Sequence, residues 1–152
     1  MSLAVYSAFP MVLNDGEKEY RFTLKLNPST DSFRLENSEI KRSVFIGRRL
    51  FNKMFQLIRN EYGTVMGRIH YTDNDMKHGS ASTTEDEQFN FEIREGNNME
   101  VIIEKEHNPL RKLKATIPNN IQNKLEREVQ HSALIPSVLA ALIFSREASL
   151  IA

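Results

Sequence analysis

Residues 39–62 read EIKRSVFIGRRLFNKMFQLIRNEY, and the pattern of this stretch decides the fold class that the sequence predicts. On a helical wheel its apolar residues occupy one half and its cations the other half. Asn37 or Ser38 can cap the start of such a helix, and Gly63 can end it. The stretch therefore predicts a long amphipathic helix, in which Phe45 is the one large apolar residue on the basic side.

The basic half of this helix is the first candidate binding site. Six cations and no acidic residue lie between Lys41 and Arg59. Gly47 leaves one alternative open, because glycine disfavours a helix: the helix begins only there, and residues 40–46 are extended. Cations along one ridge fit the phosphates of a nucleic acid. The candidate phosphate-binding residues are Lys41, Arg42, Arg48, Arg49, Lys53 and Arg59.

Alternation of apolar and polar residues predicts strands on both sides of this helix. Asn14-Asp15-Gly16 and Gly96-Asn97-Asn98 each separate two alternating runs, as turns of β-hairpins do. The predicted strands occupy residues 9–13 and 20–26 in the first hairpin, residues 64–71, and residues 89–93 and 99–103 in the second hairpin. Residues 73–87 are almost free of apolar side chains and predict a loop.

The C-terminal region predicts a second long helix, over residues 118–147. Pro118 is tolerated in a first helical turn, whereas Pro136 is expected to kink or split the helix near Ile135. The element order is therefore ββαβββα. It predicts one α+β domain over residues 1–152, with two antiparallel hairpins and one further strand in one sheet and two long helices.

Composition excludes several classes of protein. The 152 residues include 20 Lys+Arg, 20 Asp+Glu and no Cys, so disulfide frameworks and thiolate metal sites are excluded. No run of about 18 apolar residues and no signal peptide is found, which favours a cytoplasmic location by default and no membrane partner. No cofactor is expected. The two ends suggest a fragment of a longer protein, with residues 1–3 vector-derived.

The leading functional prediction comes from the apolar part of the second helix. A helix that is apolar on every side must be buried on every side, either in the middle of the fold or against a partner. We expect a non-catalytic interaction or assembly domain that self-associates through this helix, or that packs on the remainder of a longer chain. The predicted interface residues are Leu134, Ile135, Val138, Leu139, Leu142, Ile143 and Phe144.

Two further functions stay open. The first is nucleic-acid binding through the basic face of residues 39–62. The second is catalysis, for which no motif exists, so that no catalytic residue is assigned. The residues weighed for catalysis are Glu92, Glu100, Glu104 and Glu106 of the second hairpin. His70, Asp73, Asp75 and His78 lie close in sequence, but their spacing matches no metal motif, and no metal site is predicted.

Overall fold

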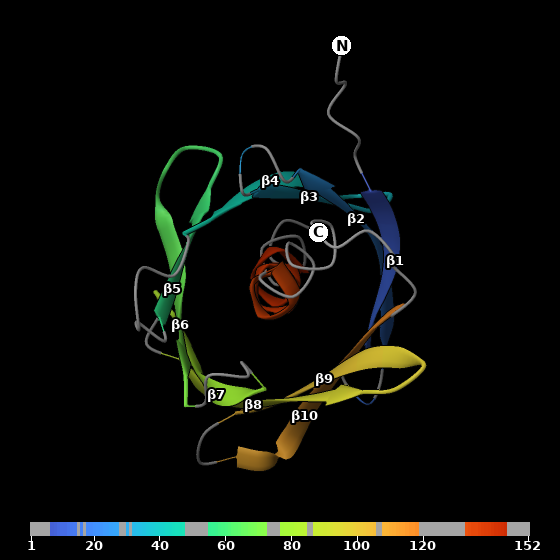
Figure 1. The fold of residues 1–152 in the computed structure, drawn as a ribbon, viewed down its shortest axis with the longest axis vertical. Coiled ribbons are helices and arrows are strands. Elements are labelled where there is room, and N and C mark those ends of the chain that lie inside the picture. Colours follow the sequence, from blue (N-terminus) through green and yellow to red (C-terminus); the bar gives the residue numbers. More distant parts are fainter. Residues whose placement is uncertain are drawn as a thin grey trace.

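The computed structural model describes residues 7–14, 16, 18–27, 30, 32–47, 55–72, 77–84, 87–105, 108–118 and 133–145. Its ten strands form one closed antiparallel barrel, in which each strand pairs with the next along the chain and β1 closes against β10 (Figure 1). The strands are β1 (Ser7–Asn14), β2 (Glu19–Asn27), β3 (Ser32–Glu36), β4 (Lys41–Ile46), β5 (Phe55–Asn60), β6 (Val65–Tyr71), β7 (His78–Thr83), β8 (Gln88–Glu95), β9 (Asn98–Lys105) and β10 (Asn108–Pro118).

The predicted α+β fold with two long helices is wrong. The stretch predicted as the first helix contains β4 and β5. Residues 40–46 are extended, as the alternative at Gly47 allowed, but β5 is a strand as well. Residues 73–87, predicted as a loop, contain β7, whose inward residues include Gly79 and Ala81. Those side chains are too small to give an apolar signal.

Three parts of the predicted sheet are confirmed. β1 pairs with β2 on either side of Gly16, which has a φ of 95°. β8 pairs with β9 as the second hairpin, and β6 covers the predicted single strand. Each of these strands has the alternation expected of a wall with one apolar face.

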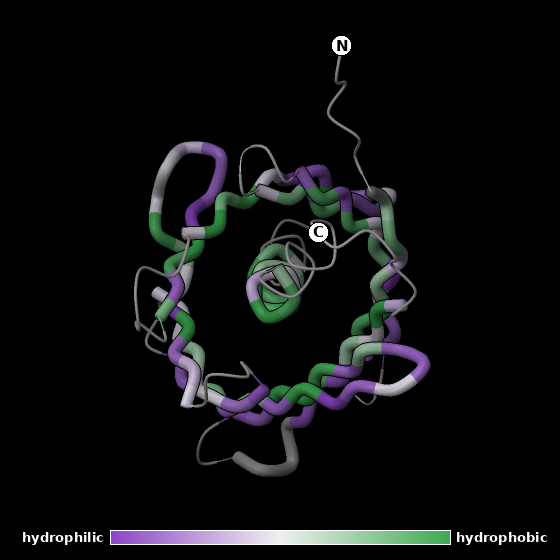
Figure 2. The backbone as a smooth tube through the Cα atoms, viewed as in Figure 1, coloured by the Kyte–Doolittle hydropathy of each residue, from purple (hydrophilic) through white to green (hydrophobic). Residues whose placement is uncertain are grey.

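The lumen of the barrel contains a helix over residues 133–145 (Figure 1). Inward side chains nearly fill an eight-stranded barrel, and the diameter grows with the number of strands. Ten strands therefore leave room for a helix, which is about 10–12 Å across with its side chains. Every residue from 133 to 142 is buried. Hydrophobic and hydrophilic residues alternate along the strands around this helix (Figure 2), and the apolar ones are mostly the buried ones.

Two contacts fix the central helix against the wall. A Cβ atom at Gly67 on β6 would lie 2.8 Å from Leu139 Cδ2 and 2.9 Å from the Ser82 carbonyl oxygen, so this position must be glycine for the helix and β7 to lie so close. Near the end of the helix, the Arg42 Cζ atom lies 4.3 Å from the centroid of the Phe144 ring. The carboxyl end of the helix therefore lies at the barrel end that carries the turn between β5 and β6.

Pro136 does not split the central helix, which is continuous over residues 133–145. The part of the predicted second helix over residues 119–132 lies outside the described residues.

Candidate functional site

β4 and β5 break the alternation of apolar residues inside and polar residues outside. On β4, Phe45 points outward and is 43% exposed, whereas Arg42 lies on the inward side together with Val44. On β5, Gln56 is buried and Phe55 is 38% exposed. These two strands therefore place polar groups in the lumen and aromatic rings on the outer surface, the reverse of an ordinary barrel wall.

The side chain of the buried Gln56 has a hydrogen-bond partner inside the barrel. Its side-chain oxygen accepts a hydrogen bond from the hydroxyl of Tyr71, which is fully buried. The Tyr71 ring in turn packs edge-on against Phe91, with ring centroids 5.5 Å apart. A buried polar group with such a partner stabilises one arrangement of the core. The inward position of Gln56 therefore has a structural role. The outward positions of Phe45 and Phe55 have no such explanation in the packing of the barrel.

Six outward residues form a patch that we call the β4–β6 outer face. Its three cross-strand pairs are Phe45 with Arg59, Leu57 with Arg68, and Phe55 with His70. Neighbours of this kind have Cβ atoms about 4.5–5.5 Å apart. Each pair thus places an apolar side chain beside a guanidinium group or an imidazole ring.

The two arginines of the β4–β6 outer face, Arg59 and Arg68, have no ion-pair partner among the described residues. Most other described cations on the outside of the barrel are paired with a carboxylate, although Lys41 and Lys112 have no ion-pair partner among the described residues either. The ion pairs there are Arg21–Glu19, Lys25–Glu36, Arg34–Glu36, Lys77–Glu95, Arg94–Glu92, Lys105–Glu87 and Lys114–Glu100. The β4–β6 outer face therefore combines exposed rings with two arginines that no described carboxylate neutralises.

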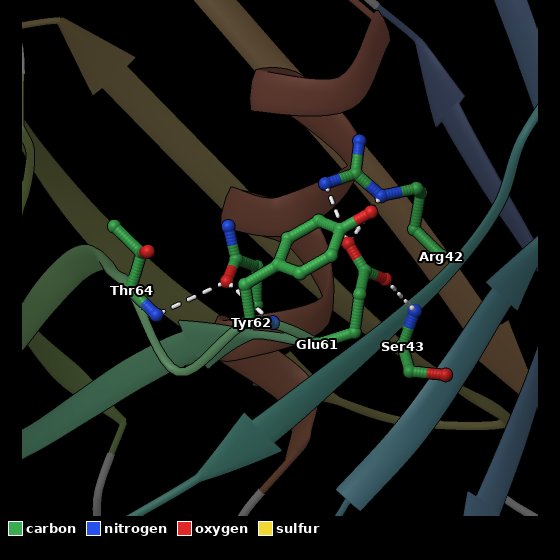
Figure 3. A network of polar contacts seen from close by, with 6 residues as sticks. Arg42, Ser43, Glu61, Tyr62 and Thr64 are labelled. Carbon is green, nitrogen blue, oxygen red and sulfur yellow. Dashed lines mark hydrogen bonds and ion pairs between the residues drawn. The ribbon is translucent and has the colours of Figure 1, made fainter.

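Arg42, on the other side of the same wall, is engaged within the chain (Figure 3). Its Nε and a terminal nitrogen each lie 2.7 Å from one carboxylate oxygen of Glu61. The backbone N–H of Ser43 donates to the other oxygen at 2.9 Å. The turn that carries Glu61 is held by the Asn60 side chain, which accepts from the N–H groups of Tyr62 and Thr64.

These contacts change the acidity of Glu61. Burial alone would raise the pKa of its carboxyl group, but the hydrogen bonds from Arg42 and from the Ser43 N–H favour the charged form. The net result is a pKa below the ordinary value. Glu61 and Arg42 therefore remain an ion pair at neutral pH, beside the Phe144 ring.

The structure describes three of the six predicted phosphate-binding residues, and these three do not all lie on one side of the wall. Lys41 and Arg59 are exposed on the outer side, whereas Arg42 faces the lumen. The remaining three, Arg48, Arg49 and Lys53, lie outside the described residues. A helix would place these cations on one face. The structure instead has the strands β4 and β5 in this region, and alternate residues of a strand point to opposite sides of the wall.

The seven predicted interface residues lie in the lumen. Six of them are buried, and Ile143 is partly buried against the same core. Leu139 contacts β6 at Gly67, and Phe144 contacts Arg42. In this structure, the barrel of the same chain is what covers the apolar helix.

The carboxylates weighed for catalysis do not converge. Glu92 and Glu100 lie on the outer side of β8 and β9 and pair with Arg94 and Lys114. Glu104 is four residues further along β9 on the same side, and Glu106 is outside the described residues. No group of three His, Asp or Glu side chains within the described ranges is placed to hold a metal ion.

Sequence analysis missed most of the β4–β6 outer face. Phe55 and Leu57 are predicted to lie in a helix, Arg68 is predicted to lie in a strand with no binding role, and His70 is considered only as a metal ligand. One signal was present, because Phe45 was the large apolar residue on an otherwise basic side. That residue is the most exposed phenylalanine of the face.

Comparisons with protein-family models, curated proteins and solved structures give no match for this chain. In the described part of the chain, no helix has both the length and the apolar character required to cross a membrane. The surface of the barrel therefore provides the evidence on function.

Proposed function

We propose that this chain is a non-catalytic binding domain that contacts the phosphates of nucleic acids through the β4–β6 outer face. The observation that supports the proposal is the position of Arg59 and Arg68, which lie opposite the exposed Phe45 and the partly buried Leu57 and have no acidic partner among the described residues. Guanidinium groups bind phosphate through paired hydrogen bonds. Cations already neutralised by carboxylates would have to give up those partners first.

The sequence has further cations in the segment that joins β4 to β5. The segment between Gly47 and Phe55 contains Arg48, Arg49 and Lys53 and no acidic residue. It joins the two strands that contribute Phe45 and Arg59. A net charge of zero for the whole chain does not oppose the proposal, because the positive charge is concentrated in one segment.

The test is binding of labelled oligonucleotides, measured by fluorescence polarisation at roughly 50 and 200 mM salt. We expect the unmodified chain to bind at low salt and to bind more weakly at high salt, because phosphate neutralisation releases counterions. A double variant, Arg59→Gln with Arg68→Gln, is expected to lose about tenfold or more in affinity, since it removes two phosphate contacts.

The matched control removes the same charge elsewhere on the barrel. Arg94→Gln with Lys114→Gln changes the outer side of β8 and β10, where both cations are ion-paired. We expect this control to bind almost as well as the unmodified chain. Equal losses in both double variants, or no binding at low salt, would contradict the proposal.

Self-association through the central helix stays a prediction, and its form is restricted by the structure. Leu134, Leu139 and Phe144 are already buried by the barrel of their own chain. Two copies could use these side chains only by exchanging helices, which would reproduce the same contacts between chains. Analytical ultracentrifugation before and after refolding at high concentration tests this, because an exchanged dimer would form on refolding. A chain that stays monomeric through refolding contradicts it.

A further inference from the structure

We infer that the ligand of the β4–β6 outer face is single-stranded rather than duplex nucleic acid. Unstacked bases would lie on the rings of Phe45 and Phe55, and the phosphates between them would lie beside Arg59 and Arg68. This inference rests on the proposed function, and it adds the class of nucleic acid and the role of the aromatic residues.

The spacing of the rings is the first argument. Phe45 lies opposite Arg59, and Phe55 is four residues before Arg59 on the same side of β5. Four residues of a strand span about 13 Å. Consecutive bases stacked in a duplex are about 3.4 Å apart along each strand and cover one another's faces. Two rings so far apart can each receive a base only from a strand whose bases are spread.

The exposure of the rings is the second argument. Phe45 is 43% exposed and Phe55 is 38% exposed, so the sheet holds each ring while a large part of it remains open to a base. Stacking of bases on aromatic side chains is the usual means of binding single strands, because every base has a flat face whatever its sequence. A duplex offers only its edges and backbone, and would leave both rings against sugars and phosphates.

The order of groups across the face is the third argument. Between the two ring-bearing pairs lies the pair of Leu57 and Arg68, so a guanidinium group lies between the two rings along the face. This order matches a strand in which phosphates and splayed bases alternate. His70, opposite Phe55, adds a third flat ring at one end. The face therefore fits sequence-tolerant binding of a short single strand.

The experiment compares three probes of about 12 units at two salt concentrations: a single-stranded oligonucleotide, the corresponding duplex, and an oligomer of the same phosphate backbone without bases. The protein is the full chain. Its variants are Phe45→Leu with Phe55→Leu, which keep an apolar side chain but remove the rings, and Arg59→Gln with Arg68→Gln. The control is Arg94→Gln with Lys114→Gln.

We expect the single strand to bind at least about tenfold more tightly than the other two probes. The phenylalanine variant should lose this advantage while its binding to the duplex and to the base-free oligomer stays the same. The arginine variant should weaken binding to all three probes and reduce the salt dependence for the single strand by about 1.4 in log–log slope.

The outcomes separate the inference from the proposed function. Equal binding of all three probes, sensitive to the arginines but not to the phenylalanines, overturns the inference and leaves phosphate binding in place. Absence of binding to any probe at low salt overturns both. Binding that is indifferent to both double variants shows that the β4–β6 outer face is not the site, and also overturns both. Circular dichroism of each variant verifies that the barrel is folded.

Discussion

The hairpin of β4 and β5 carries two arginines that each lie beside a phenylalanine, on opposite sides of the barrel wall. Arg42 points inward, lies over the Phe144 ring and pairs with Glu61. Arg59 points outward, lies opposite Phe45 and has no ion-pair partner among the described residues. The same two residue types are thus used in two different environments.

The difference between the two sides shows where stability and binding reside. The inner guanidinium has both a ring and a carboxylate of its own chain as partners. The outer guanidinium has a ring but no carboxylate. We therefore expect changes on the inner side to alter the free energy of unfolding, and changes on the outer side to alter binding.

The largest expected effect is the removal of the contact between the central helix and β6. Leu139→Ala deletes a fully buried side chain that packs at Gly67, and should lower the free energy of unfolding by about 2–5 kcal/mol. Urea denaturation measures this loss. The folded fraction should bind oligonucleotides as the unmodified chain does. A loss below about 1 kcal/mol would contradict a helix packed in the lumen.

The next effect concerns the carboxylate that holds Arg42. Glu61→Gln removes a charged acceptor from a half-buried pair and should cost about 1–2 kcal/mol in the free energy of unfolding. Glu100→Gln breaks the more exposed pair with Lys114 on the outer side and should cost at most about 1 kcal/mol. Urea denaturation measures the free energy of unfolding of both variants. Equal losses would contradict the expectation that ion pairs on the inner side contribute more to stability than those on the outer side.

The effect of Glu61→Gln on the free energy of unfolding should also depend on pH. The pKa of Glu61 is lowered by folding, so its contribution to stability is present above the unfolded pKa of about 4.3 and is lost as pH falls through the folded pKa. The difference in unfolding free energy between the unmodified chain and Glu61→Gln should therefore shrink between about pH 6 and pH 3.

Another carboxyl group provides the internal reference for this measurement. The pKa of Glu36 is also lowered, chiefly by a hydrogen bond from Lys25, and this pair is present in both proteins. Its titration therefore cancels in the difference. A difference that stays constant over the same range would show that Glu61 does not titrate with a lowered pKa in the folded chain.

Sequence alone predicts the strands of the two hairpins and β6, but it does not predict β3, although Phe33 and Leu35 on that strand are buried. β2, β8 and β9 alternate cleanly, so both hairpins were found. β7 was missed because a strand facing a crowded lumen can use small residues: a Cβ at Gly79 would lie only 2.6 Å from a ring atom of Phe91. Alternation of apolar and polar residues reveals a strand only if its inward side chains are clearly apolar. It does not reveal a strand whose inward positions must be glycine or alanine for packing.

The candidate site was missed for a related reason. In β4 and β5, Arg42 and Gln56 face inward while Phe45 and Phe55 face outward, and these reversals made an alternating pattern resemble the two halves of a helical wheel. A polar side chain that faces inward needs a polar partner. Glu61 and Tyr71 are the partners of Arg42 and Gln56, but they lie 15 or more residues away and cannot be recognised from sequence spacing. Positions that break a local rule are frequently functional, and here they mark the proposed binding face.

The smallest expected effect on stability provides the sharpest test of the comparison. Arg59→Gln removes an outward guanidinium that has no ion-pair partner among the described residues, so the free energy of unfolding should change by less than about 0.5 kcal/mol. The same substitution should weaken oligonucleotide binding severalfold, because it deletes one phosphate contact. Urea denaturation and polarisation measured on one preparation give both quantities. If Arg59→Gln destabilised the fold as much as Glu61→Gln does, its guanidinium would be part of the structure, and the outer side of the wall would no longer be the one reserved for a ligand.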